Sequence, residues 1–173
     1  APRRGAILFL MKDILIIGVA CAAALLLGGW LYFSGGNSVP GGGAGTVSMI
    51  VLDEGQDAGS VTSRTNYRIK NQEELEELWN MVHGTGAPTT IDFSKKEIIA
   101  VFDGTHVTGG YEVGISSIVE TEGGNRTVSI VRTEPGENCM TTEAISSPFQ
   151  IVVVTKSEVP YAHEEKTVVR DCE

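Results

Sequence analysis

The sequence offers few side chains whose type and spacing could support catalysis. His83, His106 and His163 have no His or Cys partner at metal-ligand spacing, so we expect surface residues and predict no metal or cofactor. Asp92 and Asp103 could pair as acid and base, but they flank one predicted strand and should lie too far apart. The chain has no Gly-x-Ser-x-Gly elbow and no phosphate-binding loop. These residues favour a protein without catalytic activity.

Two of the three cysteines follow the long apolar segment near the N-terminus. Cys139 and Cys172 are an even pair in a domain that we expect outside the cytoplasm, which predicts a disulfide. A bridge between them would close a loop of roughly 34 residues and contribute about 3–4 kcal/mol in the chain-entropy model. The alternative is two unpaired thiols.

An uncharged apolar run occupies residues 14–33. A helix rises about 1.5 Å per residue and the hydrocarbon core is about 30 Å thick, so roughly 20 residues cross a bilayer once. We therefore expect a transmembrane signal anchor. The preceding basic head, residues 1–13, contains Arg3, Arg4 and Lys12. Because Lys and Arg beside a span stay on the cytoplasmic side, we expect a cytoplasmic N-terminus and an extracytoplasmic domain.

Two other interpretations of residues 14–33 stay open. A cleaved signal peptide has an apolar region of about 7–15 residues ending in small residues. This run is longer and ends in Trp-Leu-Tyr-Phe. A lipoprotein would carry its lipid on Cys21, but the apolar sequence continues past that residue. The start of the protein also has two candidates, Ala1 and Met11, and a start at Met11 would make residues 1–10 an upstream extension.

The segment after the apolar run differs sharply in composition. Residues 34–46 contain six Gly and no charge, which predicts a flexible linker with a root-mean-square reach of about 20 Å. Residues 47–173 hold 10 Lys and Arg against 21 Asp and Glu, a net charge of −11. Acidity of this degree disfavours binding to nucleic acid and to anionic lipid, because both would repel the domain.

One amphipathic helix is well defined in the domain. Asn71 is a good N-cap, Glu74 completes a capping box, and Gly84 should end the helix. The apolar residues between them follow the i, i+3, i+4, i+7 spacing of a single helix face. They are Leu75, Leu78, Trp79 and Val82.

The rest of the domain predicts β-strands. Their expected ranges are 47–52, 63–70, 97–103, 111–119, 126–133, 149–155 and 167–170. The third and sixth of these are nearly all apolar, which is typical of central, buried strands. We therefore expect an α+β domain over residues 47–173, with one helix packed on a mainly antiparallel β-sheet.

A series of motifs in this domain has a recognisable order and spacing. They are Ile-Asp-Phe-Ser-Lys-Lys-Glu-Ile-Ile-Ala-Val-Phe-Asp-Gly at 91–104, Thr-Gly-Gly-Tyr at 108–111, Pro-Gly-x-x-Cys at 135–139, Ser-Pro-Phe at 147–149 and Asp-Cys at 171–172. Together they resemble the C-terminal domain of the protease complex subunit PrcB family, over residues 65–172. The resemblance implies an accessory protein, since the namesake subunit is a surface lipoprotein that associates with a subtilisin-like protease. This sequence departs from it by using a membrane span in place of the lipid.

The resemblance brings no catalytic residues, but it supports the pairing of a mid-domain cysteine with a C-terminal one. It also draws attention to Thr108, Gly109, Gly110 and Tyr111. The two glycines permit positive φ angles or a bulge, and Tyr111 can pack its ring with the hydroxyl outward. We regard these four residues as candidate interaction residues.

The sequence therefore predicts a single-pass membrane protein with a non-catalytic, extracytoplasmic interaction domain. We expect it to act as an accessory or assembly subunit of a surface or envelope protease. The alternative is a module of the cell envelope that binds a small molecule or a polysaccharide.

Overall fold

The computed structural model describes residues 45–86 and 88–172. The predicted segments that lie wholly outside these ranges are the basic head (1–13), the membrane span (14–33) and the linker up to residue 44. Within the described ranges, no helix is both long and apolar enough to span a bilayer. Gly45 and Thr46, predicted as the end of the linker, form strand β1.

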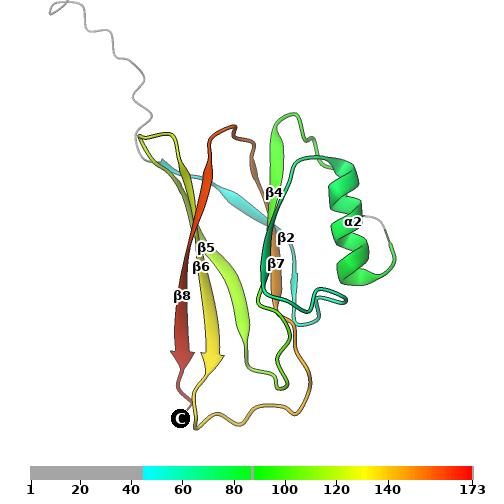
Figure 1. The fold of residues 1–173 in the computed structure, drawn as a ribbon, viewed down its shortest axis with the longest axis vertical. Coiled ribbons are helices and arrows are strands. Elements are labelled where there is room, and N and C mark those ends of the chain that lie inside the picture. The colour runs from blue at the N-terminus through cyan, green and yellow to red at the C-terminus, as the bar shows by residue number, and fades with distance from the viewer. Residues whose placement is uncertain (1–44, 87, 173) are drawn as a thin grey trace, which may run out of the picture. The chain divides into compact units, whose positions relative to one another are not determined.

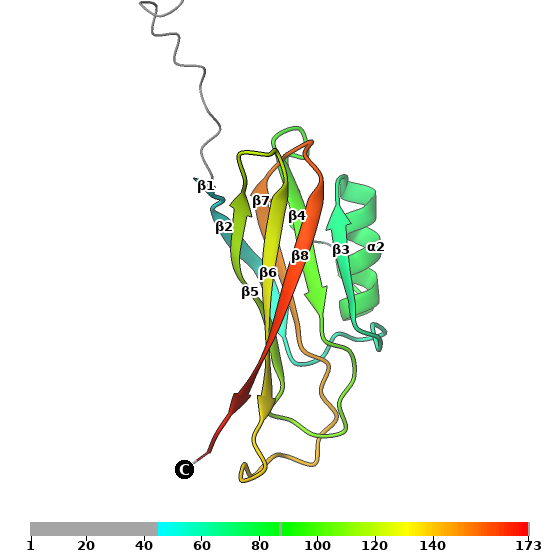
Figure 2. The same ribbon diagram turned by 60° about the vertical axis from the view of Figure 1, so that its left-hand side comes forward.

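The described residues form two four-stranded sheets and one helix (Figures 1 and 2). The central sheet has the order β2-β7-β4-β3, with β2 at Met49–Gly55, β7 at Phe149–Thr155, β4 at Lys96–Phe102 and β3 at Thr65–Ile69. The outer sheet has the order β1-β5-β6-β8, with β1 at Gly45–Thr46, β5 at Glu112–Glu120, β6 at Arg126–Pro135 and β8 at Tyr161–Arg170. All neighbours pair antiparallel except β6 and β8, which are parallel.

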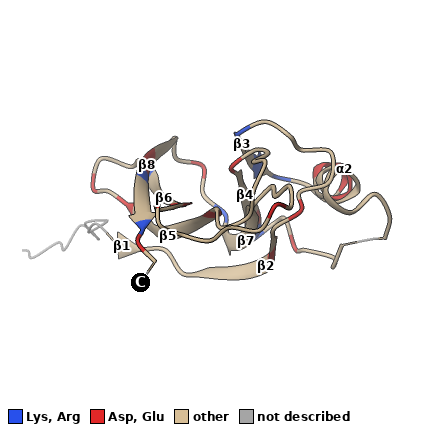
Figure 3. Cartoon of the chain, turned by 90° about the horizontal axis from the view of Figure 1, so that it is seen from below, with Lys and Arg blue, Asp and Glu red and all other residues tan. Residues whose placement is uncertain are grey.

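The central sheet is covered on both faces, by the outer sheet on one side and by helix α2, Gln72–His83, on the other (Figure 3). The core under α2 includes Leu75, Leu78, Ile98, Ala100, Phe102 and Ile151. The core between the sheets includes Ile99, Val101, Ile115, Ile118, Val128, Ile130 and Val152. Strands β4 and β7 contribute alternate residues to both cores, which explains why their sequences are continuously apolar.

Helix α2 confirms its sequence prediction closely. The Asn71 side chain accepts a hydrogen bond from Glu74 N at 2.9 Å, and Gly84 ends the helix with φ = 70°. The Glu74 carboxylate accepts from Lys70 N at 2.8 Å. The residues predicted from the sequence to cap the helix therefore provide hydrogen bonds to backbone groups at both of its ends.

The predicted α+β class with one helix and mainly antiparallel strands is confirmed, but two details of the prediction are wrong. The strands form two sheets rather than one, because β4 and β7 carry apolar side chains on both faces and need a cover on each. The C-terminal strand is ten residues long rather than the four of 167–170, so it also includes His163. Its polar sequence lacks the apolar alternation that marks a strand.

A buried carboxylate joins the two sheets. Glu97 of β4 has no solvent exposure, and its oxygens accept hydrogen bonds from the central and the outer sheet. The donors are Arg68 Nε at 2.8 Å, Arg126 Nη1 at 3.3 Å, Ser157 N at 3.0 Å and the Tyr161 hydroxyl at 2.6 Å. Because the carboxylate is fully paired, its charge is tolerated in the interior.

Tyr161 is the member of this network that can titrate at alkaline pH. Burial, followed by the hydrogen bond to Glu97, raises the pKa of Tyr161 from 10.0 to about 12. Arg126 Nη1 donates to the Tyr161 oxygen at 2.7 Å, and the Arg68 guanidinium lies 4.0 Å from the ring centroid. The folded protein therefore holds Tyr161 as a neutral phenol at a pH where the unfolded chain ionises it.

The raised pKa of Tyr161 predicts a loss of stability between pH 10 and 12, since only the unfolded state releases the proton in that window. We expect the free energy of unfolding to fall more steeply with pH in the natural chain than in Tyr161→Phe. The expected difference is on the order of 1–2 kcal/mol, allowing for the partial exposure of the ring. Urea unfolding of both proteins at pH 9 to 11.5 measures it. Parallel pH profiles would contradict the prediction.

Candidate functional site

Two long loops meet at one end of the sheets, at the bottom of Figure 1. We call this the loop end, and define it by the β4–β5 loop, residues 103–111, and the β6–β7 loop, residues 136–148. The loops pair through a bridge between His106 and Ser146, with N–O distances of 2.8 and 3.0 Å. A further backbone bond joins Gly109 N to Thr142 O at 3.1 Å. The two loops therefore form one structure rather than two independent connections.

A buried acid holds the β4–β5 loop in place. Asp103 is 5% exposed and follows β4 directly; its carboxylate accepts from Arg132 Nε of β6 and lies 2.7 Å from His106 Nε2. The hydrogen bond to Asp103 raises the pKa of Arg132, so this guanidinium stays charged. The His106 ring in turn stacks on Tyr111, with centroids 3.7 Å apart and planes 6° from parallel. The chain from Asp103 to Tyr111 is thus closed into a fixed loop.

The four candidate interaction residues lie in this loop. Thr108 O accepts from the Ser146 hydroxyl at 2.8 Å. Gly110 has φ = 95°, and a Cβ there would lie 3.2 Å from Pro135 Cβ, so glycine fits the close approach of the two loops. Gly109, Gly110 and Tyr111 line a groove of about 290 Å³. Gly110 is exposed and the other three residues are partly buried, while the loop backbone is fixed by the neighbouring loop.

A larger groove of about 590 Å³ adjoins the first, and the two share Gln56 and Glu112. It follows the start of β5 on the outer sheet and the end of β2 on the central sheet. Its polar lining residues include Glu54, Gln56, Glu112, Ser116, Thr133 and Gln150. The Gln150 side chain crosses between the sheets: it accepts from Ile115 N at 2.8 Å and donates to Glu54 at 2.9 Å. The groove floor is therefore hydrogen-bonded and pre-formed.

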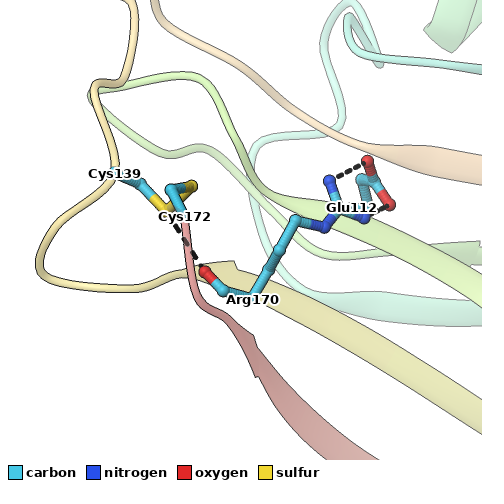
Figure 4. Close-up of a disulfide and its surroundings, with 4 residues drawn as sticks. All are labelled: Glu112, Cys139, Arg170 and Cys172. Atoms are coloured by element: carbon cyan, nitrogen blue, oxygen red, sulfur yellow. Dashed lines mark hydrogen bonds and ion pairs between the residues drawn. A yellow bond between two sulfur atoms is a disulfide. The ribbon is translucent and has the colours of Figure 1, made fainter.

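The C-terminal residues tie the rim of this groove to the β6–β7 loop (Figure 4). Arg170 of β8 donates to both oxygens of Glu112, at 2.9 and 2.7 Å, and this bidentate bond lowers the pKa of the Glu112 carboxyl. Two residues later, Cys172 forms a disulfide with Cys139, with Cα atoms 5.0 Å apart. The predicted cysteine pair thus lies at disulfide distance, and it fixes the C-terminus against the loop end.

The loop end brings an acid and a histidine close to several serines. The His106–Asp103 pair resembles part of a catalytic triad, but the nearby serines are used structurally: Ser146 donates to Thr108 O, and the Ser147 hydroxyl lies 3.0 Å from Thr105 Oγ1. Within residues 45–86 and 88–172, no cluster of three or more His, Cys, Asp or Glu side chains could hold a metal ion.

Exposed apolar side chains surround this rigid frame. Val107 is 82% exposed, Met140 is fully exposed and Ile145 is 74% exposed, and all three lie on the two loops. All three side chains are therefore accessible for contact with another molecule.

Sequence reasoning placed some of these residues correctly and missed others. Asp92 serves in a turn rather than as an acid or base partner of Asp103, since its side chain accepts from Ser94 N at 3.1 Å. His83 and His163 are exposed, as predicted, whereas His106 is partly buried. The sequence did not signal that the His106 and His83 ring nitrogens each lie 2.7 Å from a carboxylate oxygen, of Asp103 and Asp53 respectively. The His83–Asp53 pair joins residues far apart in the sequence, and the His106–Asp103 pair depends on the conformation of the β4–β5 loop. Neither pair is indicated by a local sequence pattern.

Comparison with known protein families gives one match. Residues 98–155 match the family model described as PrcB C-terminal, which confirms the resemblance predicted from the motifs. The matched segment runs from β4 to the end of β7 and includes both loops of the loop end. Neither a curated protein nor a solved structure matches the chain.

The disulfide predicts a measurable effect on the loop end. We expect the double variant Cys139→Ser/Cys172→Ser to lose on the order of 3 kcal/mol of stability, because its unfolded state is no longer cross-linked. Amide hydrogen exchange across residues 136–148 should quicken at the same time, since the loop loses its covalent tie to β8. Urea unfolding and hydrogen exchange measure the two effects. The control variant Cys21→Ser should leave both unchanged, and a double variant equal to this control would contradict the prediction.

Proposed function

We propose that this chain is an anchored, non-catalytic subunit that binds a surface or envelope protease through its loop end. The observation that carries the proposal is the PrcB C-terminal match over residues 98–155, because that segment builds both loops of the loop end. The family resemblance associates the domain with a protease complex. The protein would act by docking rather than by chemistry on a substrate.

The loop end is suited to docking because its backbone is fixed and its tips are apolar. Asp103 and the Cys139–Cys172 disulfide hold one loop each, so little conformational entropy is lost when a partner binds. Val107, Met140 and Ile145 offer apolar area that water covers in the free domain. Rigid loops that present exposed side chains on a β-scaffold are a common form of binding surface.

The position of the loop end agrees with an anchored protein. The described chain begins at β1, which pairs with the end of β5 at Glu120, whereas the loop end lies at the start of β5. Figure 2 shows the two at opposite ends of the sheets. We propose that residues 14–33 anchor the chain with its domain outside the cytoplasm. The loop end would then lie at the end of the domain opposite the strand that follows the linker.

The second candidate function is binding of a small molecule or polysaccharide in the larger groove. Its volume of about 590 Å³ lies in the range of ligand pockets. Its lining includes a single aromatic residue, Phe149, while sugar and small-molecule sites commonly use several aromatic or apolar walls. The exposed apolar loops favour the protein partner.

Affinity capture tests the proposed docking. The tagged chain is recovered from detergent-solubilised membranes of its own source, and the eluate is labelled with a covalent serine-protease probe. We expect a labelled protease with the natural chain and at least about a tenfold loss with Val107→Ser/Met140→Ser/Ile145→Ser, because truncated anchors at an interface centre cost several kcal/mol together.

The matched control is Ile50→Ser, which changes an exposed apolar residue on β2, away from the two loops. It should capture the protease as the natural chain does. Absence of a labelled protease with the natural chain, or equal capture by the triple variant, would overturn the proposed function.

A further inference from the structure

Strand β8 is a long, exposed edge. It pairs with β6 on one side only, and nine of its ten residues, from Ala162 to Arg170, are exposed. Figure 2 shows it running along the full height of the outer sheet. An edge of this length carries a row of backbone N–H and C=O groups open to pairing with another strand.

The register with β6 shows which face each β8 residue occupies. Tyr161, His163 and Glu165 lie opposite Arg126, Val128 and Ile130, all of which are buried. These three β8 residues are therefore on the inner face, with Thr167 and Val169 continuing the row. Ala162, Glu164, Lys166 and Val168 alternate with them on the outer face.

The side chains of β8 are complementary in charge and hydrophobicity to those of an antiparallel copy when the two-fold axis passes through Glu165. Each pair of directly opposed residues then lies on the same side of the joined sheet. The pairs are Glu164 with Lys166, Ala162 with Val168, Tyr161 with Val169 and His163 with Thr167, each formed twice. Opposite charges and apolar pairs placed directly across two strands stabilise a sheet.

The single like-charge contact in this register is compensated. Glu165 meets its own copy at the axis, but in each chain its carboxylate already pairs with Arg64. Shifting the axis to Lys166 would instead oppose two lysines and would pair Glu164 with Val168. The charges of β8 thus favour one register and disfavour its neighbour.

We propose that two copies of this chain associate through β8, antiparallel and centred on Glu165, so that their outer sheets form one continuous sheet. The interaction surface is separate from the loop end, since no β8 residue lines either groove described above. It is independent of the proposed protease partner. Because the two copies of β8 run antiparallel, the two loop ends of such a dimer would lie at opposite ends of the joined sheet.

Charge exchange on β8 tests the proposal with the full chain in detergent micelles. Sedimentation velocity over a dilution series should show a monomer–dimer equilibrium. Glu164→Lys and Lys166→Glu each create two like-charge contacts per dimer, and we expect each to raise the dissociation constant at least about tenfold. The double variant Glu164→Lys/Lys166→Glu restores both pairs with the charges exchanged, and its dissociation constant should return to the natural value. The control Glu76→Lys changes an exposed charge on α2 and should have no effect.

A second measurement tests the register directly. A cysteine at position 165 meets its own copy at the axis, so Glu165→Cys should form an intermolecular disulfide on mild oxidation, while Val168→Cys, which faces Ala162, should not. A natural chain that stays monomeric, a dimer insensitive to Glu164→Lys and Lys166→Glu, or equal cross-linking at 165 and 168 would overturn the proposal.

Discussion

The fold depends on two carboxylate–arginine pairs that connect β4 of the central sheet to β6 of the outer sheet. Glu97 at the start of β4 accepts from Arg126, and Asp103 just after β4 accepts from Arg132. Both acids are buried, so each pair can persist only if it is complete: removing one partner of a buried pair typically costs about 3–5 kcal/mol. Apolar packing between the sheets tolerates small shifts, whereas these pairs specify which strands face each other.

The two pairs lie at opposite ends of β4 and stabilise different parts of the domain. The Glu97 pair is extended by Arg68 and Tyr161, so that it joins β3, β4, β6 and β8 in one hydrogen-bonded network. The Asp103 pair is extended by His106, whose ring stacks on Tyr111, so that its effect reaches the surface of the loop end. One buried acid therefore stabilises the sheets, and the other positions the loops from which we infer function.

The sequence predicted those features that depend on neighbouring residues. Asn71, Glu74 and Gly84 mark the helix because capping is a local hydrogen-bond problem, and the apolar runs of β4 and β7 mark central strands because burial on both faces requires them. The Thr108–Tyr111 motif was singled out by the family resemblance, and it lies in the β4–β5 loop, ending at the residue before β5. Most of strand β8 was not predicted because its residues are mainly polar. A strand at the edge of a sheet can be stabilised by backbone hydrogen bonds alone, so its sequence need not show alternating hydropathy. The buried pairs could not be predicted, because residues 29 apart meet only through sheet stacking.

Val107 and Ile145 expose apolar area to water at the tips of the two loops, which costs free energy. Mobile loops would lower this free-energy cost by folding the side chains back onto the domain. The Asp103–Arg132 pair and the Cys139–Cys172 disulfide prevent such a collapse. The structure thus keeps apolar side chains in water, in a domain whose net charge of −11 favours solubility, and these side chains are available to the partner that we propose.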